Sequence, residues 1–211
     1  MTDADAEWRP TATPEMLRRR AALLAEIRAF FAERSVLEVE TPMLSAAAAT
    51  DPALASLTSE VTTTGGRRRM YWHTSPEFPM KRLLAADMGS VYQICRVFRD
   101  GEAGRQHNPE FTMLEWYRPG ADEHGLMDEI EALLARVAGD DAAPAERLTY
   151  AAAVQRGAGV DPLRASVAEM AECLAAHGIE TASLDPVRET DPDLWRDLLM
   201  SHLVAPHLGH E

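Results

Sequence analysis

The sequence predicts a globular protein that combines helices with strands, and three observations support this fold class. Segments near both ends of the chain place apolar residues at helical spacing. Two consecutive segments, 91–99 and 110–117, are instead typical of strands. The composition, with 46% hydrophobic and 26% charged residues, is ordinary for a folded domain. No run of about 18 apolar residues occurs, so no membrane-spanning helix is expected.

The first predicted element is a helix that begins at Thr13-Pro14-Glu15 and ends near Arg34. A threonine N-cap, a proline at the first helical position and an acid in the first turn all favour this start. A short strand over 36–40 follows, and Pro42 ends it. One face of the helix carries Leu17, Ala21, Leu24, Ile27 and Phe31.

The middle of the chain predicts a hairpin, a helix, two strands and a further helix, in that order. Gly65-Gly66 marks the hairpin turn, between segments rich in strand-forming residues. A polar loop of ten residues, DGEAGRQHNP, separates the two strands, and a connection this long is more often functional than a short turn. The predicted ranges are 57–63 paired with 69–73, 76–86, 91–99, 110–117 and 122–138.

The chain from 145 onward reads as helical. Ser166 and Glu169 form a capping box that opens a helix ending at Gly178. Thr190-Asp-Pro-Asp193 opens another helix, expected to run through Leu203. No further strand is predicted in this region.

Charge and cysteine usage exclude several classes of protein. The net charge is −13, and 7 basic and 20 acidic side chains lie in residues 106–211, so a generic nucleic-acid binder is disfavoured. Cys95 and Cys173 are too few for a disulfide scaffold or a zinc site, which favours a reducing cytoplasm. The three C-terminal histidines fit no strong metal-ligand spacing, and no metal site is expected in this chain. They are His202, His207 and His210. Dinucleotide-binding, P-loop and common serine-hydrolase motifs do not occur.

The strand 110–117 places a carboxylate among large apolar neighbours. A period of two puts Phe111, Met113, Glu115 and Tyr117 on one face. A carboxylate on a packed face is costly unless a cation meets it. Either the face is exposed or Glu115 pairs with a structural arginine, or else the strand is the floor of a pocket in which Glu115 binds an ammonium group.

Two other positions allow a structural and a functional interpretation. Arg99 ends a strand beside the long loop, where its planar fork suits a phosphate, but pairing with Asp100 or a surface acid is the common alternative. Ser75-Pro76-Glu77 precedes a helix. Ser75 is a candidate N-cap and Glu77 complements the helix dipole; alternatively, Glu77 closes a second side of an ammonium pocket.

Three segments taken together resemble class II aminoacyl-tRNA synthetases of the lysyl type. VLEVETP is similar to their motif 1, SPEFPMKRL lies between the motifs, and FRDGEAGRQHNPEFTMLEWY is similar to their motif 2. The resemblance is collinear and covers roughly residues 14–138. It implies an α+β fold in which an antiparallel sheet is flanked by helices, and a homodimer formed through the motif 1 region.

Within this family the chain is most similar to the stand-alone ligases that attach (R)-β-lysine to translation elongation factor P. TSPEFPMKRLLAA and EWYRPG resemble those ligases, and only about a dozen residues precede the first helix where a synthetase carries an anticodon domain. The resemblance implies use of ATP and Mg²⁺, with (R)-β-lysine or lysine as substrate and elongation factor P as acceptor. A catalytic fragment that aminoacylates lysine tRNA, which the acidic charge disfavours, and a non-catalytic paralog are the alternatives.

The resemblance also implies roles for individual residues. Ser75, Pro76 and Glu77 would contact the amino-acid substrate, and Glu115 and Tyr117 would receive its lysine-like side chain. Arg99 would be the catalytic residue that holds the ATP α-phosphate. The remaining nucleotide-binding residues would be Asp100, Gly101, Glu102, His107, Asn108 and Phe111, with Phe111 stacking on adenine.

The chain departs from the family in two ways. The Arg-x-Glu of motif 2 appears here with the acid one place late, at Glu102, so either Glu102 takes that role after a loop adjustment or no residue does. Motif 3, which carries metal-binding carboxylates and a second ATP-binding arginine, is absent. We therefore expect a tail over 1–13, a catalytic core over 14–144 that is incomplete at its C-terminus, a helical insertion over 145–211, and poor activity of this 211-residue chain alone.

Overall fold

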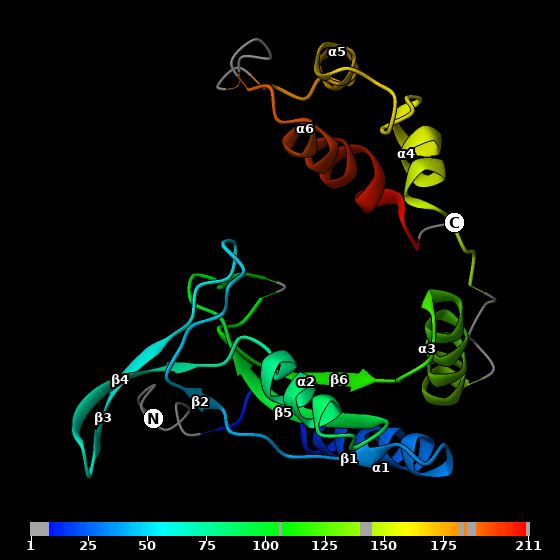
Figure 1. Cartoon of the computed structure of the whole chain (residues 1–211). Helices are drawn as coiled ribbons and strands as arrows, with labels where there is room; N and C mark the ends of the chain where they lie inside the picture. The colour runs from blue at the N-terminus through cyan, green and yellow to red at the C-terminus, as the bar shows by residue number, and fades with distance from the viewer. Residues whose placement is uncertain (1–8, 106, 140–144, 182–183, 185–188, 210–211) are drawn as a thin grey trace, which may run out of the picture. The chain divides into compact units, whose positions relative to one another are not determined.

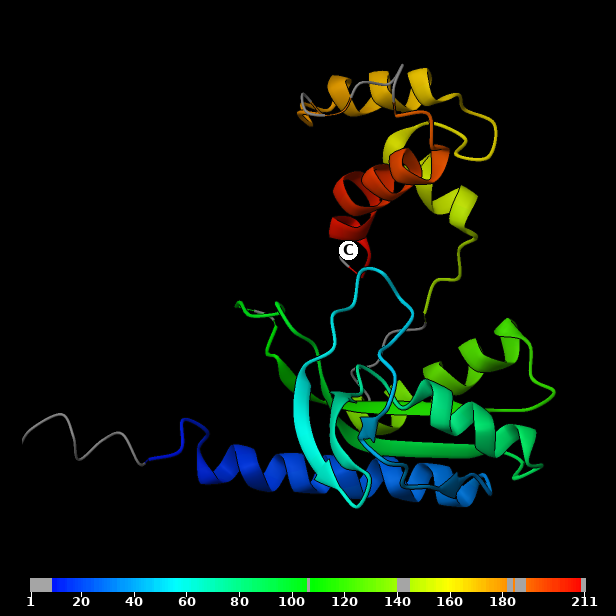
Figure 2. The ribbon, with the colours of Figure 1, turned by 60° about the vertical axis from the view of Figure 1, so that its left-hand side comes forward.

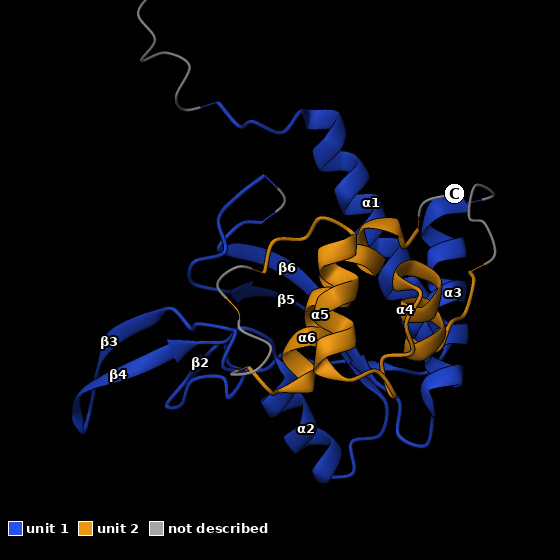
Figure 3. Ribbon diagram, turned by 90° about the horizontal axis from the view of Figure 1, so that it is seen from above, with its two compact units in different colours: residues 1–144 blue, residues 145–211 orange. Residues whose placement is uncertain are grey.

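The computed structural model describes residues 9–105, 107–139, 145–181, 184 and 189–209. The chain divides into two compact units, residues 1–144 and residues 145–211 (Figure 3). Gln106 of the polar loop, His210 and residues 1–8 of the predicted tail lie outside the described residues. None of the helices in the described part of the chain is both long enough and apolar enough to cross a bilayer.

The first unit is built around a three-stranded sheet in the order β1-β5-β6. Strands β5 (Val91–Phe98) and β6 (Glu110–Tyr117) are antiparallel along their full length, as the resemblance implied. Strand β1 (Leu37–Glu38) is shorter than the predicted 36–40 and pairs with β5 in parallel, so the sheet is mixed rather than antiparallel throughout. Helices α1 (Pro14–Glu33) and α3 (Glu123–Ala138) complete this part, and Figures 1 and 2 show α1 running alongside the sheet.

One face of this sheet is closed by the core of the unit. Phe31 of α1 stacks on Tyr92 of β5 with ring centroids 4.5 Å apart, and Leu133 of α3 joins the same cluster. Side chains alternate along a strand, so Tyr92 and Trp116 point to the core while Gln93 and Glu115 point to the opposite face. The second face is therefore the one on which a site can be built.

A second sheet and a short helix border that face. Its order is β2 (Leu44–Ser45), β4 (Gly66–Trp72) and β3 (Thr58–Thr63). The predicted hairpin is confirmed, but β4 begins at Gly66, earlier than expected, because Arg67–Arg69 pair with Glu60–Thr62. Helix α2 (Glu77–Ala85) follows β4, as predicted.

The second unit is helical, as the sequence predicts, with its own core. It contains α4 (Tyr150–Ala158), α5 (Val167–Ala176) and α6 (Pro192–Leu199), and the predicted capping box at Ser166 is present. The prediction of a helix through Leu203 was wrong in detail, since α6 ends at Leu199 and a π-helical turn, η3 (Met200–Val204), and a 3₁₀ turn, η4 (Ala205–His207), follow. The core of this unit includes Val154, Met170, Leu174, Trp195 and Leu199.

Candidate active site

The open face of the β5–β6 pair gathers most of the residues that the sequence singled out. Glu115 lies opposite Gln93, and Phe111 lies opposite Val97, in the antiparallel register. Residues directly opposite one another share a face, so the predicted grouping of Phe111, Met113, Glu115 and Tyr117 is confirmed. Glu115 and Phe111 are four residues apart, about 13 Å along the strand. The face is long enough for two different groups of one extended ligand.

Glu115 lies at one end of this face, where its carboxylate accepts hydrogen bonds from two hydroxyl groups. The Ser75 hydroxyl donates to Oε2 at 2.6 Å, and the Tyr117 hydroxyl donates to Oε1 at 2.7 Å. Burial and the adjacent carboxylate of Glu115 raise the pKa of Tyr117, which keeps its phenol a neutral donor. Within the described residues, no cationic side chain lies within ion-pair distance of Glu115. The structural-arginine interpretation is therefore wrong, and the carboxylate is placed to receive a cation from a ligand.

Ser75 reaches Glu115 because of how α2 begins. The suggested N-cap role was wrong: Pro76, which is buried, occupies the N-cap position, and Ser75 precedes it. The Ser75 oxygen still accepts from the backbone N–H of Glu77 at 3.0 Å, so it closes the first turn while donating to Glu115. Glu77 is half-buried in that turn and pairs with Lys81 at 2.5 Å.

Arg99 lies at the other end of the face, beyond the end of β5. Its Nε donates to the carbonyl oxygen of Thr74 at 3.3 Å, and its guanidinium lies 5.1 Å from the centroid of the Phe111 ring. Its acidic neighbour is Glu102 at 3.6 Å rather than Asp100. Both members of this pair are only partly exposed. Glu102, which stands one position later than the acid of the family's Arg-x-Glu pattern, therefore does pair with Arg99.

The long loop after Arg99 is held mainly by its own backbone. Asp100 accepts from the N–H of Gly101 at 3.0 Å, and Gly101 adopts a positive φ of 79° that favours glycine. The backbones of Gly104 and His107 exchange hydrogen bonds. Within the described residues, no hydrogen bond or ion pair joins the side chain of His107 or Asn108 to Arg99. The side chains of His107 and Asn108, which were predicted to bind the nucleotide, therefore do not contact Arg99 through a hydrogen bond or ion pair in the described part of the chain.

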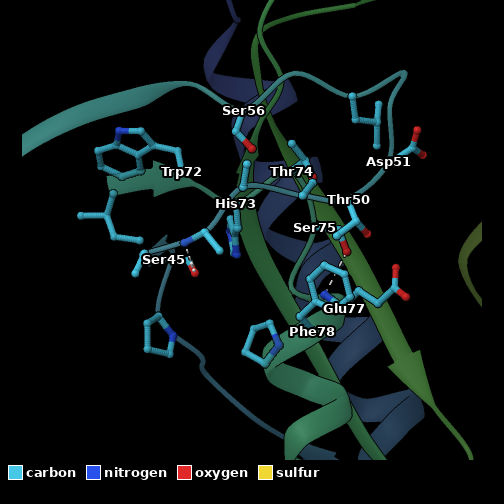
Figure 4. A pocket seen from close by; sticks show the side chains of 18 of the residues that line it. Ser45, Thr50, Asp51, Ser56, Trp72, His73, Thr74, Ser75, Glu77 and Phe78 are labelled. Atoms are coloured by element: carbon cyan, nitrogen blue, oxygen red, sulfur yellow. Dashed lines mark hydrogen bonds between the residues drawn. The ribbon is translucent and has the colours of Figure 1, made fainter. Parts of the chain in front are cut away.

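A cavity beside Ser75 is the feature that sequence reasoning missed. It has a volume of about 560 Å³ and lies between the loop 42–56 and the start of α2 (Figure 4). Its wall includes Ser75 and Glu77, together with Trp72, His73 and Phe78. The one available signal was the run Ala46–Ala49, because four small side chains in a row leave space that larger ones would fill.

Gln93 was also not singled out as a site residue. It is 1% exposed, and its Oε1 accepts from the buried hydroxyl of Thr41 at 2.9 Å. The pair ties the residue before Pro42 to the strand that faces Glu115. It thereby anchors the start of the loop 42–56 against the site.

No group of three or more histidine, cysteine, aspartate or glutamate side chains that would suit a metal ion occurs within the described residues.

Comparison with known proteins places these observations in a family. The protein-family model described as tRNA synthetases class II (D, K and N) matches residues 5–181 of this chain. The chain is 47% identical, over 98% of its length, to proteins named elongation factor P--(R)-beta-lysine ligase from Salmonella paratyphi B, Salmonella schwarzengrund and Salmonella heidelberg. It spans 62% of the length of these curated relatives. The chain belongs to the family of class II tRNA synthetases of the D, K and N type.

Proposed function

We propose that the protein to which this chain belongs activates (R)-β-lysine or lysine with ATP and transfers it to a lysine side chain of translation elongation factor P. One observation supports this most directly. A half-buried carboxylate, Glu115, is held by two neutral donors and faces the same side of the sheet as Arg99 and Phe111. An ammonium group at one end and a nucleotide at the other fit that arrangement. The names of the relatives support the same assignment.

The residues on this face suggest how the first half-reaction proceeds. Glu115 binds the side-chain ammonium group of the substrate, while Ser75 and Tyr117 fix the orientation of the carboxylate. The substrate carboxylate then attacks the α-phosphorus of ATP, and pyrophosphate leaves. Arg99 stabilises the negative charge on the α-phosphate, and Phe111 offers a ring face to adenine. Glu102 orients the Arg99 guanidinium.

The second half-reaction needs no covalent enzyme intermediate. The neutral amine of the acceptor attacks the acyl carbon, and the bond from that carbon to the phosphate oxygen of AMP breaks. The family implies Mg²⁺, which would stabilise the phosphate charges.

The proposal extends to partners and setting. The protein acceptor is a translation factor, so the enzyme would act in the cytoplasm, and the motif 1 region around α1 and β1 would form a homodimer. The surplus of acidic side chains in residues 106–211 disfavours tRNA as acceptor, since phosphate binding depends largely on lysine and arginine.

A labelled-substrate assay tests the proposal with the protein expressed from its complete reading frame. ATP and labelled α-lysine or β-lysine are offered together with elongation factor P and lysine tRNA. We expect the label on elongation factor P, with β-lysine preferred. Label on tRNA would instead make the protein a lysyl-tRNA synthetase, and label on neither acceptor would leave a non-catalytic paralog as the better interpretation.

A further inference from the structure

The reaction proposed above involves three ligands, but the open face of the β5–β6 pair accounts for only two of them. The amino acid is expected at Glu115 and the nucleotide at Arg99 and Phe111. The third ligand is the lysine side chain of the protein acceptor, which must reach the acyl carbon between those two ends. Any place for it has to border the face without occupying it.

The cavity beside Ser75, here called the loop pocket, meets this condition. Its wall comes from the loop 42–56 and from residues 72–82, and it includes neither Glu115 nor Arg99. It is joined to the face through Ser75, which lines the pocket and also donates to Glu115 at 2.6 Å. Ser75 and Glu77, which are expected to contact the amino acid, form the border between the pocket and the amino-acid site, while the wall from the loop 42–56 lies outside the expected amino-acid contacts.

The lining of the loop pocket suits an alkyl chain that ends in an amine. Leu44, Leu54, Trp72 and the alanine run provide apolar surface for a methylene stem. Figure 4 shows Thr50, Asp51, Ser75 and Glu77 toward one side and Trp72 toward the other. The polar side is thus the side that adjoins Glu115 through Ser75.

One carboxylate on the polar side, that of Asp51, is available to a cation. Lys81 already pairs with Glu77, whereas Asp51 has no cationic partner within the described residues. Asp51 accepts a hydrogen bond from the N–H of Ala53 through one oxygen, which leaves its other oxygen available. The basic residues of the wall are His73 and Arg82. Asp51 is therefore the carboxylate that an incoming ammonium group would meet.

Two wall residues carry unpaired polar atoms that also favour a donor. The Nε2 of His73 lies 2.6 Å from the carbonyl oxygen of Arg96, so in a neutral ring that nitrogen carries the proton and Nδ1 is an acceptor. Within the described residues, Nδ1 of His73 and the hydroxyl oxygen of Ser56 are buried without a hydrogen-bond partner. Both residues line the pocket, although these two atoms are themselves buried.

We propose that the loop pocket receives the lysine side chain of the protein acceptor and guides its amine to the acyl carbon. This inference rests on the proposed function. The ammonium loses one proton to become the nucleophile, the C–N bond forms, and the second proton leaves to solvent. The carbon–oxygen bond to AMP breaks, and AMP departs with the bonding electrons.

The test separates the two half-reactions in the protein expressed from its complete reading frame. Ala49→Leu fills the pocket from a half-buried position, and Ala53→Leu adds the same bulk to the same loop outside the pocket wall. We expect Ala49→Leu to lower kcat/KM for elongation factor P about tenfold. Lysine-dependent exchange of pyrophosphate into ATP should stay within about twofold of the unsubstituted enzyme, as should trapping of the adenylate by hydroxylamine. Ala53→Leu should leave both half-reactions unchanged.

A charge variant provides an independent measurement. Asp51→Asn keeps the oxygen that accepts from Ala53 but removes the negative charge. It should raise the KM for elongation factor P by about fivefold and reduce its dependence on salt. Asp87→Asn removes a charge from an exposed position outside the pocket and should do neither.

Two outcomes would overturn the inference while leaving the proposed function intact. If Ala49→Leu impairs pyrophosphate exchange as much as transfer, the pocket belongs to the amino-acid site. If it impairs neither, the acceptor does not enter there. Failure of the unsubstituted protein to modify elongation factor P is a different result, and it overturns the proposed function together with this inference.

Discussion

At the scale of single residues, the proposed cation site depends on Glu115. Both of its oxygens accept hydrogen bonds from neutral hydroxyl groups. Such donors orient a carboxylate but leave its charge uncompensated. A carboxylate that is only partly exposed and not paired with a cation favours a cationic ligand more strongly than a surface acid does.

Glu115→Gln should therefore impair amino-acid activation far more than it changes the fold. The substitution keeps the size of the side chain but removes the charge, and loss of one partner of a buried charge pair costs about 2–5 kcal/mol. We expect kcat/KM for lysine in pyrophosphate exchange to fall by about 100-fold or more. Tyr117→Phe, which removes one neutral hydrogen bond, should cost only about fivefold. Equal losses in the two variants would contradict a charge-based role.

Three tyrosines, Tyr92, Tyr117 and Tyr150, have a pKa raised above the ordinary value for a phenol, and burial is the largest cause for each. Burial and the hydrogen bond to Glu38 raise the pKa of Tyr92 to about 12, and burial and Glu115 raise that of Tyr117. The folded state then holds protons that the unfolded state has already released. The contribution of Tyr92 to stability is thus complete below pH 10 and is lost as the pH rises from about 10 to about 12. Absorbance at 295 nm measures the ionisation, and Tyr92→Phe should remove the step near pH 12; an unchanged curve would refute the assignment.

At the scale of elements, the strand period predicted the open face, while the turns and contacts around it were not predictable. Phe111, Glu115 and Tyr117 lie on one face because side chains alternate along any strand. The parallel pairing of β1 was missed, since Leu37–Glu38 is too short to carry a periodic pattern. Ser75 was a candidate N-cap, and its hydrogen bond to Glu115 could not be predicted because the two residues are distant in the sequence. The loop pocket was not predicted, because a run of small residues such as Ala46–Ala49 does not by itself indicate a cavity.

Helix α4 should be sensitive to one added methyl group. A Cβ built on Gly157 would lie 2.7 Å from the carbonyl oxygen of Leu203, closer than packed atoms allow. Gly157→Ala should therefore lower the stability of the second unit by about 1–3 kcal/mol, although alanine is the better helix former. Hydrogen exchange of amides in residues 145–211 measures the effect.

Gly125 in α3 provides the matched control for that substitution. The nearest atom to a Cβ built there is 3.5 Å away, which is an ordinary contact. Gly125→Ala should leave stability unchanged or raise it by up to about 1 kcal/mol. Similar protection from exchange in Gly157→Ala and the unsubstituted chain would show that the two helical segments do not meet as closely as described.

At the scale of the whole molecule, the two units have separate apolar cores. Phe30, Phe31 and Tyr92 belong to one cluster, and Met170 and Trp195 belong to the other. A domain needs its own buried core to fold by itself. We therefore expect a fragment of residues 145–211 to fold alone and to unfold cooperatively in urea, as measured by circular dichroism and by the fluorescence of Trp195. A non-cooperative fragment without helical signal would contradict this.

A small helical unit of this kind should depend on each of its largest core residues. Leu174 is fully buried, and its replacement by alanine costs about 2–5 kcal/mol in a packed core. That loss is comparable to the entire stability of a domain this small, so Leu174→Ala should unfold the fragment at room temperature. Leu163, in the same unit, is 67% exposed, and Leu163→Ala should change stability by no more than about 0.5 kcal/mol. If both variants remain folded with equal midpoints, the core of residues 145–211 does not stabilise the unit by itself, and its fold depends on contacts with the rest of the protein.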